Sequence, residues 1–299
     1  MNIGNHMELL PCQDSEQRAQ LCRTLLDIPF DRAADLGRSA IEITRRGWYE
    51  NRRGKRVDIR GDVRAAVEGK HSIPPDDPLS FRSPITPSPA KTQIQVCNET
   101  TFHAAYRLAG QYGRSALLNF ANGTHPGGGF LQGATAQEEV LCRSSALFAA
   151  LEGDPMYEFH LRRTLPDSSD WIIYAPGVPV FRSDDGQELD EIWKVDVLTC
   201  AAPYAPLVGA DASAILLEKR VYRLLETAAA LGCRTLVLGA WGCGAFENDP
   251  DRTALDFRRA LESSYDGVFD AVVFAVADWS PDRYYFRPFC RHLGAGYEE

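Results

Sequence analysis

The sequence predicts an α/β domain of three layers, built on a largely parallel sheet and preceded by a separate N-terminal region. From Thr92 onward, short apolar runs typical of strands alternate with longer runs typical of helices. Two glycine-rich segments follow strands of this domain and lead towards helices. Ligands of such sheets bind beyond the carboxyl ends of the strands, so we expect the functional site beside these segments.

Residues 1–91 are predicted to form a mainly helical accessory region. Two helices are expected there, separated at Pro29, because proline breaks the interior of a helix. The first would begin at a capping box opened by Asp14. The second would run from about residue 31 to residue 46 and end at Gly47.

A hairpin and a proline-rich segment complete this region. Residues 48–59 predict two short strands that turn near Gly54. Residues 72–89 contain six prolines, which indicates an extended linker. We therefore expect an accessory region over residues 1–91 and a main domain over residues 92–299.

Within the main domain, strands and helices are expected in alternation. The expected strands are residues 93–97, 116–120, 171–175, 195–200, 235–238 and 271–276. The expected helices are residues 101–111, 136–151, 212–231 and 251–262.

The composition is that of a soluble globular protein. Of 299 residues, 44% are hydrophobic and 24% are charged, and no apolar stretch reaches the roughly 18 residues of a membrane span. The first residues lack the layout of a secretion signal, so we expect a cytoplasmic protein without a membrane partner. The eight cysteines show no zinc-ligand spacing, so we expect no structural metal. We also expect no cofactor.

The charge is distributed unevenly along the chain. The net charge is -9, and residues 96–299 alone carry 17 basic and 28 acidic side chains, whereas residues 44–70 carry nine basic and four acidic ones. An acidic domain binds polyanions poorly, which argues against sequence-specific recognition of nucleic acid. Any phosphate that this domain binds is therefore expected to be held by backbone amides.

The first glycine-rich segment contains Asn122 and three consecutive glycines, Gly127, Gly128 and Gly129. Glycine permits positive φ and lets a ligand approach the backbone closely. The N–H groups of these glycines could form a nest for phosphate oxygens or ribose hydroxyls. The alternative is a flexible connection without a ligand.

A polar triplet, Gln137, Glu138 and Glu139, follows the glycines at the start of an apolar helical stretch. Acidic residues are common in a first helical turn, because they complement the helix dipole. Adjacent helical residues diverge by about 100°, so both carboxylates cannot face one atom. One could act on a ligand while the other positions it.

The second glycine-rich segment contains Gly242, Cys243, Gly244, Ala245 and Phe246. Its backbone amides could cradle a diphosphate, although a plain connection is again the alternative. Neither segment matches a phosphate-binding loop of the ATPase type, and no lysine stands where a terminal phosphate would need one. A nucleotide diphosphate that is not hydrolysed at its phosphates fits better than ATP.

Taken in order, these motifs resemble the bacterial-type poly(ADP-ribose) glycohydrolases, which are catalytic macrodomains. The signature of that family is Gly-Gly-Gly, a spacer and Gln-Glu-Glu, which here are residues 127–129 and 137–139. The Phe-Ala-Asn sequence at residues 120–122 and the Trp-Gly-Cys-Gly-Ala-Phe sequence at residues 241–246 also match. The resemblance spans roughly residues 42–289.

The resemblance implies a macrodomain that hydrolyses the O-glycosidic bonds between riboses of poly(ADP-ribose), mainly from chain ends, and releases ADP-ribose. It implies that Glu139 is the general acid and base, that Glu138 and Asn122 hold ribose hydroxyls, and that Gln137 also binds substrate. The three glycines would line the catalytic end, and residues 242–246 would hold the diphosphate, with the Phe246 ring against the terminal ribose. The implied partners are poly(ADP-ribose), ADP-ribose and ADP-ribosylated proteins.

Two other functions stay open at this point. A macrodomain can bind ADP-ribose without hydrolysing it, but a pure reader does not need the two carboxylates. A macrodomain can also remove single ADP-ribose groups from proteins. The basic residues 44–70 are either a solvated face or a guide for the polymer chain.

Several single residues also stay open. Adenine would stack on one of four aromatic residues near the C-terminus: Trp279, Tyr284, Tyr285 or Phe286. His125 and Cys243 invite roles as base and nucleophile, but neither has an evident partner, and we expect neither role. Tyr204 stands where the family would have Asn, which affects the expected local contacts.

Overall fold

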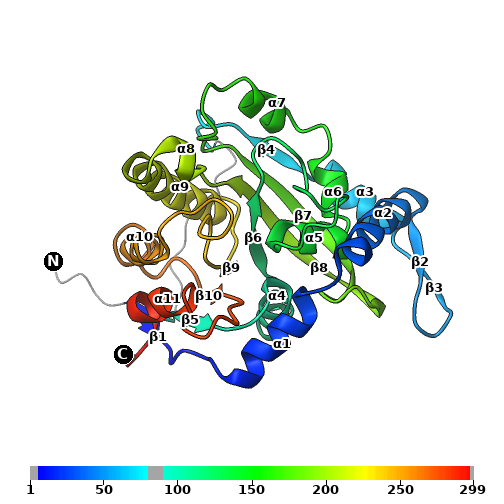
Figure 1. Cartoon of the computed structure of the whole chain (residues 1–299), viewed down its shortest axis with the longest axis horizontal. Helices are drawn as coiled ribbons and strands as arrows, with labels where there is room; N and C mark the ends of the chain where they lie inside the picture. The colour runs from blue at the N-terminus through cyan, green and yellow to red at the C-terminus, as the bar shows by residue number, and fades with distance from the viewer. Residues whose placement is uncertain (1–5, 80–89, 297–299) are drawn as a thin grey trace.

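The computed structural model describes residues 6–79 and 90–296, which form an eight-stranded sheet between two groups of helices (Figure 1). In spatial order, the strands are β1 (Met7–Leu9), β5 (Thr92–Cys97), β10 (Ala271–Ala275), β9 (Thr235–Leu238), β6 (Ala116–Ala121), β8 (Glu188–Ala201), β7 (Ile172–Arg182) and β4 (His71–Ile73). The first six strands in this spatial order, from β1 to β8, run parallel to one another. β7 pairs antiparallel with β8, and β4 pairs antiparallel with β7. The predicted mixed, largely parallel sheet is confirmed.

Eleven helices lie within the described residues, and a short hairpin lies outside the sheet. The helices are α1 (Glu16–Leu26), α2 (Phe30–Arg46), α3 (Arg60–Glu68), α4 (Thr101–Tyr112), α5 (Gln137–Ser144), α6 (Leu147–Leu151), α7 (Pro155–Leu161), α8 (Ala205–Val208), α9 (Ala210–Ala230), α10 (Pro250–Ser263) and α11 (Phe286–Leu293). The hairpin consists of β2 (Trp48–Glu50) and β3 (Arg56–Asp58), as predicted for residues 48–59.

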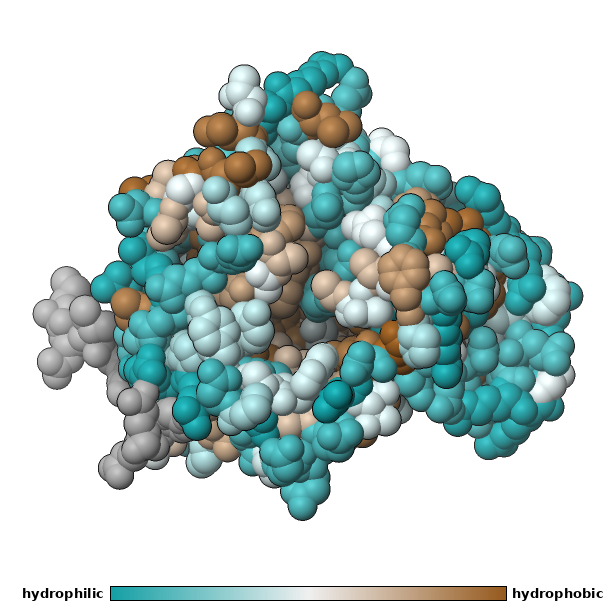
Figure 2. Space-filling model, in the orientation of Figure 1, coloured by the Kyte–Doolittle hydropathy of each residue, from teal (hydrophilic) through white to brown (hydrophobic). Residues whose placement is uncertain are grey.

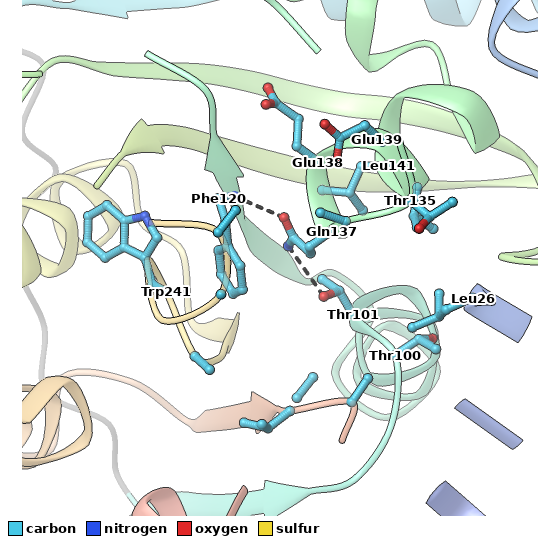
Figure 3. Close-up of a pocket in the computed structure, with 18 of the residues that line it drawn as sticks. Leu26, Thr100, Thr101, Phe120, Thr135, Gln137, Glu138, Glu139, Leu141 and Trp241 are labelled. Carbon is cyan, nitrogen blue, oxygen red and sulfur yellow. Dashed lines mark hydrogen bonds between the residues drawn. The ribbon is translucent and has the colours of Figure 1, made fainter. Parts of the chain in front are cut away.

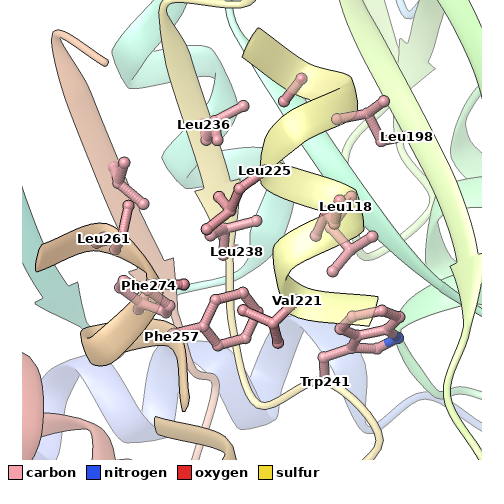
Figure 4. Packing of buried hydrophobic residues seen from close by; sticks show 14 of the residues in the cluster. Leu118, Leu198, Val221, Leu225, Leu236, Leu238, Trp241, Phe257, Leu261 and Phe274 are labelled. Carbon is pink, nitrogen blue, oxygen red and sulfur yellow. The ribbon is translucent and has the colours of Figure 1, made fainter. Parts of the chain in front are cut away.

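The alternation of side chains along each strand produces the three layers. On β6, Leu118 packs with Val221 of α9 and Phe257 of α10 in one apolar cluster (Figure 4). Its neighbour Leu117 belongs to a second cluster on the opposite face, together with Leu141 of α5. Successive strand residues point to opposite faces, so both faces of a central strand are apolar and are covered by helices.

The N-terminal region is tied to the sheet rather than only preceding it. β1 pairs with β5, and β4 pairs with β7, so the sheet takes strands from both sides of the boundary expected at residue 91. The expected proline-rich linker lies partly in residues 80–89, outside the described residues, and its first two residues, 72 and 73, belong to the strand β4. No helix of the described chain is both long and apolar enough to cross a membrane.

Two helix boundaries differ from those predicted. α1 is capped by Ser15, whose Oγ accepts from the Arg18 N–H at 3.2 Å, while Asp14 pairs with Arg283 at 3.0 Å. The single helix expected over residues 136–151 is broken at Ser145, which is extended and forms a bridge with Val180 of β7. This tertiary contact ends α5 after two turns.

Candidate active site

A cavity of about 390 Å³ opens at the carboxyl ends of the parallel strands. Its walls come from the segments that follow β5, β6, β9 and β10 and from the first turn of α5 (Figure 3). Figure 2 shows this face hollowed near its centre, with apolar side chains in the hollow. No Lys, Arg or His belongs to the described residues that line the cavity. A phosphate bound here would therefore need backbone N–H groups as donors.

Glu138 lies buried in the first turn of α5, with both carboxylate oxygens occupied. Oε1 accepts from Asn119 Nδ2 at 3.3 Å and from Gly127 N at 3.2 Å, and Oε2 accepts from Asn122 N at 2.7 Å. Burial raises the pKa of Glu138 to about 8, with a further rise from the charge of Glu139, although the N–H donors oppose it. Glu138 therefore fastens α5 to the segment that follows β6.

Glu139, the next residue, has one carboxylate oxygen without a partner. Oε1 accepts from Gly129 N at 2.9 Å, whereas Oε2 is buried and has no hydrogen-bond partner among the described residues. The side chain lines the cavity. A carboxyl group that is oriented through one oxygen and open at the other can exchange a proton with a bound molecule.

The three glycines hold these carboxylates rather than facing the cavity. The N–H groups of Gly127 and Gly129 donate to the two glutamates, and the N–H of Gly128 donates to the His125 carbonyl at 3.0 Å. None of the three glycines lines the cavity. The expected nest for phosphate or ribose is therefore not formed here, because the N–H groups are already bonded within the protein.

The loop after β9 supplies unbonded N–H groups in their place. Gly242, Gly244, Ala245 and Phe246 line the cavity, and their N–H groups have no acceptor within residues 6–79 and 90–296. A row of such donors in a cavity without basic side chains is suited to an anion. This geometry agrees with the diphosphate site predicted for this loop.

Asn248 holds that loop in place. Its Nδ2 donates to the carbonyls of Pro203 at 2.9 Å and Gly242 at 3.1 Å, and its Oδ1 accepts from Ser213 Oγ at 2.6 Å. The side chain is buried. No sequence motif marks Asn248, because its role depends on hydrogen bonds to Pro203 and Ser213 in other segments of the chain.

Comparisons with known proteins agree with this geometry. The profile of a family described as "Microbial-type PARG, catalytic domain" matches residues 37–183. The structure of the poly(ADP-ribose) glycohydrolase from Thermomonospora curvata is 40% identical, with a TM-score of 0.83, and the match covers 88% of this chain and 99% of that one. The same enzyme bound to the inhibitor ADP-HPD is 41% identical, with a TM-score of 0.81, and the match covers 87% and 99%.

A more distant solved structure is the poly(ADP-ribose) glycohydrolase from Deinococcus radiodurans in complex with ADP-ribose. It is 36% identical, with a TM-score of 0.73, and the match covers 79% of this chain and 98% of that one. No match was found among curated proteins. The chain belongs to the microbial-type poly(ADP-ribose) glycohydrolase family. The predicted macrodomain fold is therefore confirmed.

Cys243, which was predicted to bind substrate with the rest of the β9 loop, is placed differently from its neighbours. It does not line the cavity: its Sγ donates to the Trp241 carbonyl at 3.6 Å and its N–H donates to the Ala240 carbonyl at 3.1 Å. Burial raises the pKa of the thiol to about 12, so the thiol is protonated near neutral pH and is no nucleophile. Cys243 packs behind the loop.

Tyr204, which stands where the family would have Asn, contacts the end of the same loop. Its ring centroid lies 5.8 Å from that of Phe246, at an interplanar angle of 82°. This edge-to-face contact supports the Phe246 ring beside the cavity.

Asn122 lines the cavity as predicted and also shapes its own loop. Its Oδ1 accepts from the N–H groups of Thr124 at 2.9 Å and His125 at 3.0 Å. Its Nδ2 is left without an acceptor among the described residues and can donate to a ligand. His125 itself bonds Thr124 Oγ1 through Nδ1 at 2.9 Å and does not line the cavity.

Gln137 lines the cavity, but its amide is engaged with β6. Oε1 accepts from Phe120 N at 2.9 Å, and Nε2 donates to the Leu118 carbonyl at 2.7 Å and to Thr101 Oγ1 at 3.3 Å (Figure 3). These bonds join the start of α5 to the strand beside it. The geometry favours a positioning role for Gln137 over direct binding.

The cavity also contains residues that sequence analysis missed. Among the aromatic candidates, Trp279 and Tyr285 line it, Tyr284 lines a second cavity, and Phe286 is buried. The lining residues that no motif indicated include Leu26, Glu99, Thr100, Thr101, Thr135 and Asp184. Glu99, Thr100 and Thr101 could have been expected here, because they follow β5 and the carboxyl ends of parallel strands meet at one edge of the sheet. No group of three or more potential metal ligands occurs among residues 6–79 and 90–296.

Proposed function

We propose that this chain is a poly(ADP-ribose) glycohydrolase, which cleaves the ribose–ribose O-glycosidic bond and releases ADP-ribose, with Glu139 as general acid and base. The observation that carries the assignment of Glu139 is its buried Oε2, which lacks a partner within the described chain, whereas both oxygens of Glu138 are occupied. The family and the two solved relatives named for this activity, one with bound ADP-ribose, support the reaction.

The terminal ADP-ribose would lie along the cavity. Its diphosphate would accept from the unbonded N–H groups of Gly242, Gly244, Ala245 and Phe246, which compensate for the lack of basic side chains. Its adenine would stack near Trp279 or Tyr285, which line the cavity after β10. Asn122 Nδ2 would hold a ribose hydroxyl beside the carboxylates.

The reaction needs one proton donor that later becomes an acceptor. Protonated Glu139 gives its proton to the departing ribose 2′-oxygen while the bond from that oxygen to the anomeric carbon breaks and oxocarbenium character develops. The resulting carboxylate then takes a proton from water as the water oxygen bonds to the anomeric carbon. Gly129 N–H orients Glu139 in both steps through Oε1.

Cleavage mainly at chain ends is part of the proposal. In this mode the terminal unit fills the cavity with its glycosidic bond at the carboxylates, and the rest of the chain leaves past α2, which packs against the loop that carries the glycines. Early samples of a polymer digest should then contain free ADP-ribose rather than oligomers. Early accumulation of oligomers would contradict this part.

The deciding experiment compares the wild-type protein with Glu139→Gln on poly(ADP-ribose). Loss of a positioned acid–base group should lower turnover by about 10²- to 10⁴-fold while ADP-ribose binding survives. Glu152→Gln, on an exposed residue after α6, is the matched control and should retain full rate. A Glu139→Gln rate close to wild type would refute the role of Glu139.

The same assay separates the other functions. Binding of ADP-ribose without release from polymer by the wild type would indicate a reader. Release of ADP-ribose from singly modified proteins but not from polymer would indicate a hydrolase for single ADP-ribose groups. Its ADP-ribosylated partners would then be proteins that carry single ADP-ribose groups.

A further inference from the structure

The β2–β3 hairpin region carries a cluster of cations that the proposed reaction does not use. Eight basic and only three acidic side chains lie between Arg45 and Arg64, although the net charge of the chain is -9. The hairpin projects from the molecule beside α2 and α3, and the surface over it is hydrophilic (Figure 1, Figure 2).

Most of these cations have no carboxylate partner in the described part of the chain. Arg53 pairs with Asp190 at 3.0 Å, and Asp62 of the same region pairs with Lys194 at 2.6 Å. The remaining basic residues are exposed and form no ion pair with residues 6–79 or 90–296; they are Arg45, Arg46, Arg52, Lys55, Arg56, Arg60 and Arg64. Their charge is left for a partner outside the chain.

An aromatic ring orders two of these guanidinium groups. Cζ of Arg46 lies 4.3 Å and Cζ of Arg56 lies 4.4 Å from the ring centroid of Trp48. Arg46 Nε also donates to the Trp48 carbonyl at 2.7 Å, and Arg60 Nη2 donates to the Arg46 carbonyl at 3.4 Å. A cation–π contact holds a guanidinium group in place without neutralising it. Arg46 and Arg56 are therefore ordered and still carry their full positive charge.

Helix α2 connects this cluster to the catalytic loop, which is the loop that carries the three glycines at residues 127–129. A side chain at Gly37 of α2 would overlap the Phe130 carbonyl, and Arg38 Nη1 donates to the Leu131 carbonyl at 3.5 Å. The helix ends at Gly47, where the hairpin begins. The nine residue steps from Gly37 to Arg46 rise about 14 Å at about 1.5 Å per residue, so the cluster begins about this far along α2 from the glycine loop.

We propose that the hairpin cluster binds diphosphate groups of poly(ADP-ribose) units that precede the bond being cleaved. This inference rests on the proposed function. With the terminal diphosphate at residues 242–246 and its glycosidic bond at Glu139, the rest of the chain leaves the cavity towards the glycine loop and α2. Each of its units carries a diphosphate, and guanidinium groups bind phosphate through paired N–H donors. Because α2 links the cluster to the catalytic loop, the observations favour the polymer over a nucleic acid.

The test removes three positive charges of the cluster without touching Trp48 or its two guanidinium neighbours. A variant with Arg52→Gln, Lys55→Gln and Arg64→Gln should show kcat/KM on long polymer lowered about tenfold, and unchanged kcat/KM on two joined ADP-ribose units. The slope of log kcat/KM against log salt on polymer should become shallower by roughly 2. The matched control places the same charge change directly after α7 and on α9 and α10, as Arg162→Gln, Lys219→Gln and Arg259→Gln, and should leave polymer turnover unchanged.

A second measurement does not depend on turnover. In the Glu139→Gln background, the hairpin variant should bind fluorescent polymer about tenfold more weakly but bind ADP-ribose equally well. Equal binding of polymer by both proteins would overturn the docking site. Tight binding of a single-stranded DNA oligonucleotide that depends on the cluster, with polymer binding unaffected, would assign the cluster to nucleic acid instead. If the wild type releases no ADP-ribose from any substrate, the proposed function fails, and this binding result still decides the hairpin.

Discussion

Gly128 shows how one residue position limits the chemistry of the site. Its φ is +57°, and an added Cβ would overlap Oε1 of Glu139 and lie 3.1 Å from Oε2 of Glu138. Any side chain there would displace the carboxyl group that the mechanism needs. The sequence motif marks this glycine, but the reason for it is a close contact with residues ten and eleven positions later.

We expect Gly128→Ala to lower turnover on poly(ADP-ribose) about 10²-fold or more, with ADP-ribose binding largely kept, because the β9 loop is untouched. Gly113→Ala is the matched control: its φ is +83°, but an added Cβ would meet nothing within 4 Å. This control separates backbone strain from displacement of Glu139. Similar loss of turnover in both variants would show that strain, and not the carboxylate contact, is responsible.

The raised pKa of Glu138 predicts that the stability of the protein depends on pH. Burial raises its pKa from 4.5 to about 8, so folding favours the protonated carboxyl. The stabilisation from that preference is complete below about pH 4.5 and is lost as the pH rises to about 8. Glu138→Gln removes the titration, so the stability of the wild type relative to this variant should fall by roughly 2–5 kcal/mol over that interval.

Urea unfolding midpoints of both proteins at several pH values between 5 and about 8.5 provide the measurement. Glu152→Gln, at an exposed position, should track the wild type at every pH. A difference between wild type and Glu138→Gln that is independent of pH would contradict the raised pKa.

At the scale of elements, the loop from β9 to α10 depends on one side chain from its own end. Asn248 donates to the carbonyls of Pro203 and Gly242 and so keeps the unbonded N–H groups of the loop at the cavity. Asn248→Ala should raise the Kd for ADP-ribose by roughly 10- to 100-fold, because buried carbonyls lose their donors. Isothermal titration calorimetry measures this change.

Ser213→Ala is the control for this loop, because it removes only the hydroxyl that bonds Asn248 Oδ1 and leaves the donors to the loop in place. Its effect on the Kd should be much smaller. Equal Kd values for Asn248→Ala and the wild type would show that the loop is held by other contacts.

The elements that sequence analysis located are the long ones with a clear period. The helix over residues 31–46 and the strands of the main domain agree with the structure to within a few residues at most ends, although β7 and β8 extend into a long antiparallel pair. The break at Ser145 escaped prediction because a bridge to Val180, a distant residue, causes it. The short α3 and α7 escaped because two turns carry little periodicity.

At the scale of the whole molecule, the sheet unites segments that the sequence separates. β1 and β4 have three residues each, too few to show a period, yet they extend the sheet at both edges. α2 reaches from the catalytic loop to the basic hairpin and so connects two features that sequence analysis treated separately. The division of the chain at residue 91 stays a prediction, and strands from both sides of it pair in one sheet.

The sequence by itself determined the α/β class, the family and the residues of the two glycine-rich segments, because these depend on local period and on motifs that are continuous in the chain. Only the tertiary structure decided how those residues divide their roles. It placed the N–H groups of Gly127 and Gly129 on Glu138 and Glu139, left four N–H groups of the β9 loop unbonded, and turned Cys243 into the core. The physical reason is that each of these roles depends on which donor meets which acceptor across segments, and sequence spacing does not contain that information.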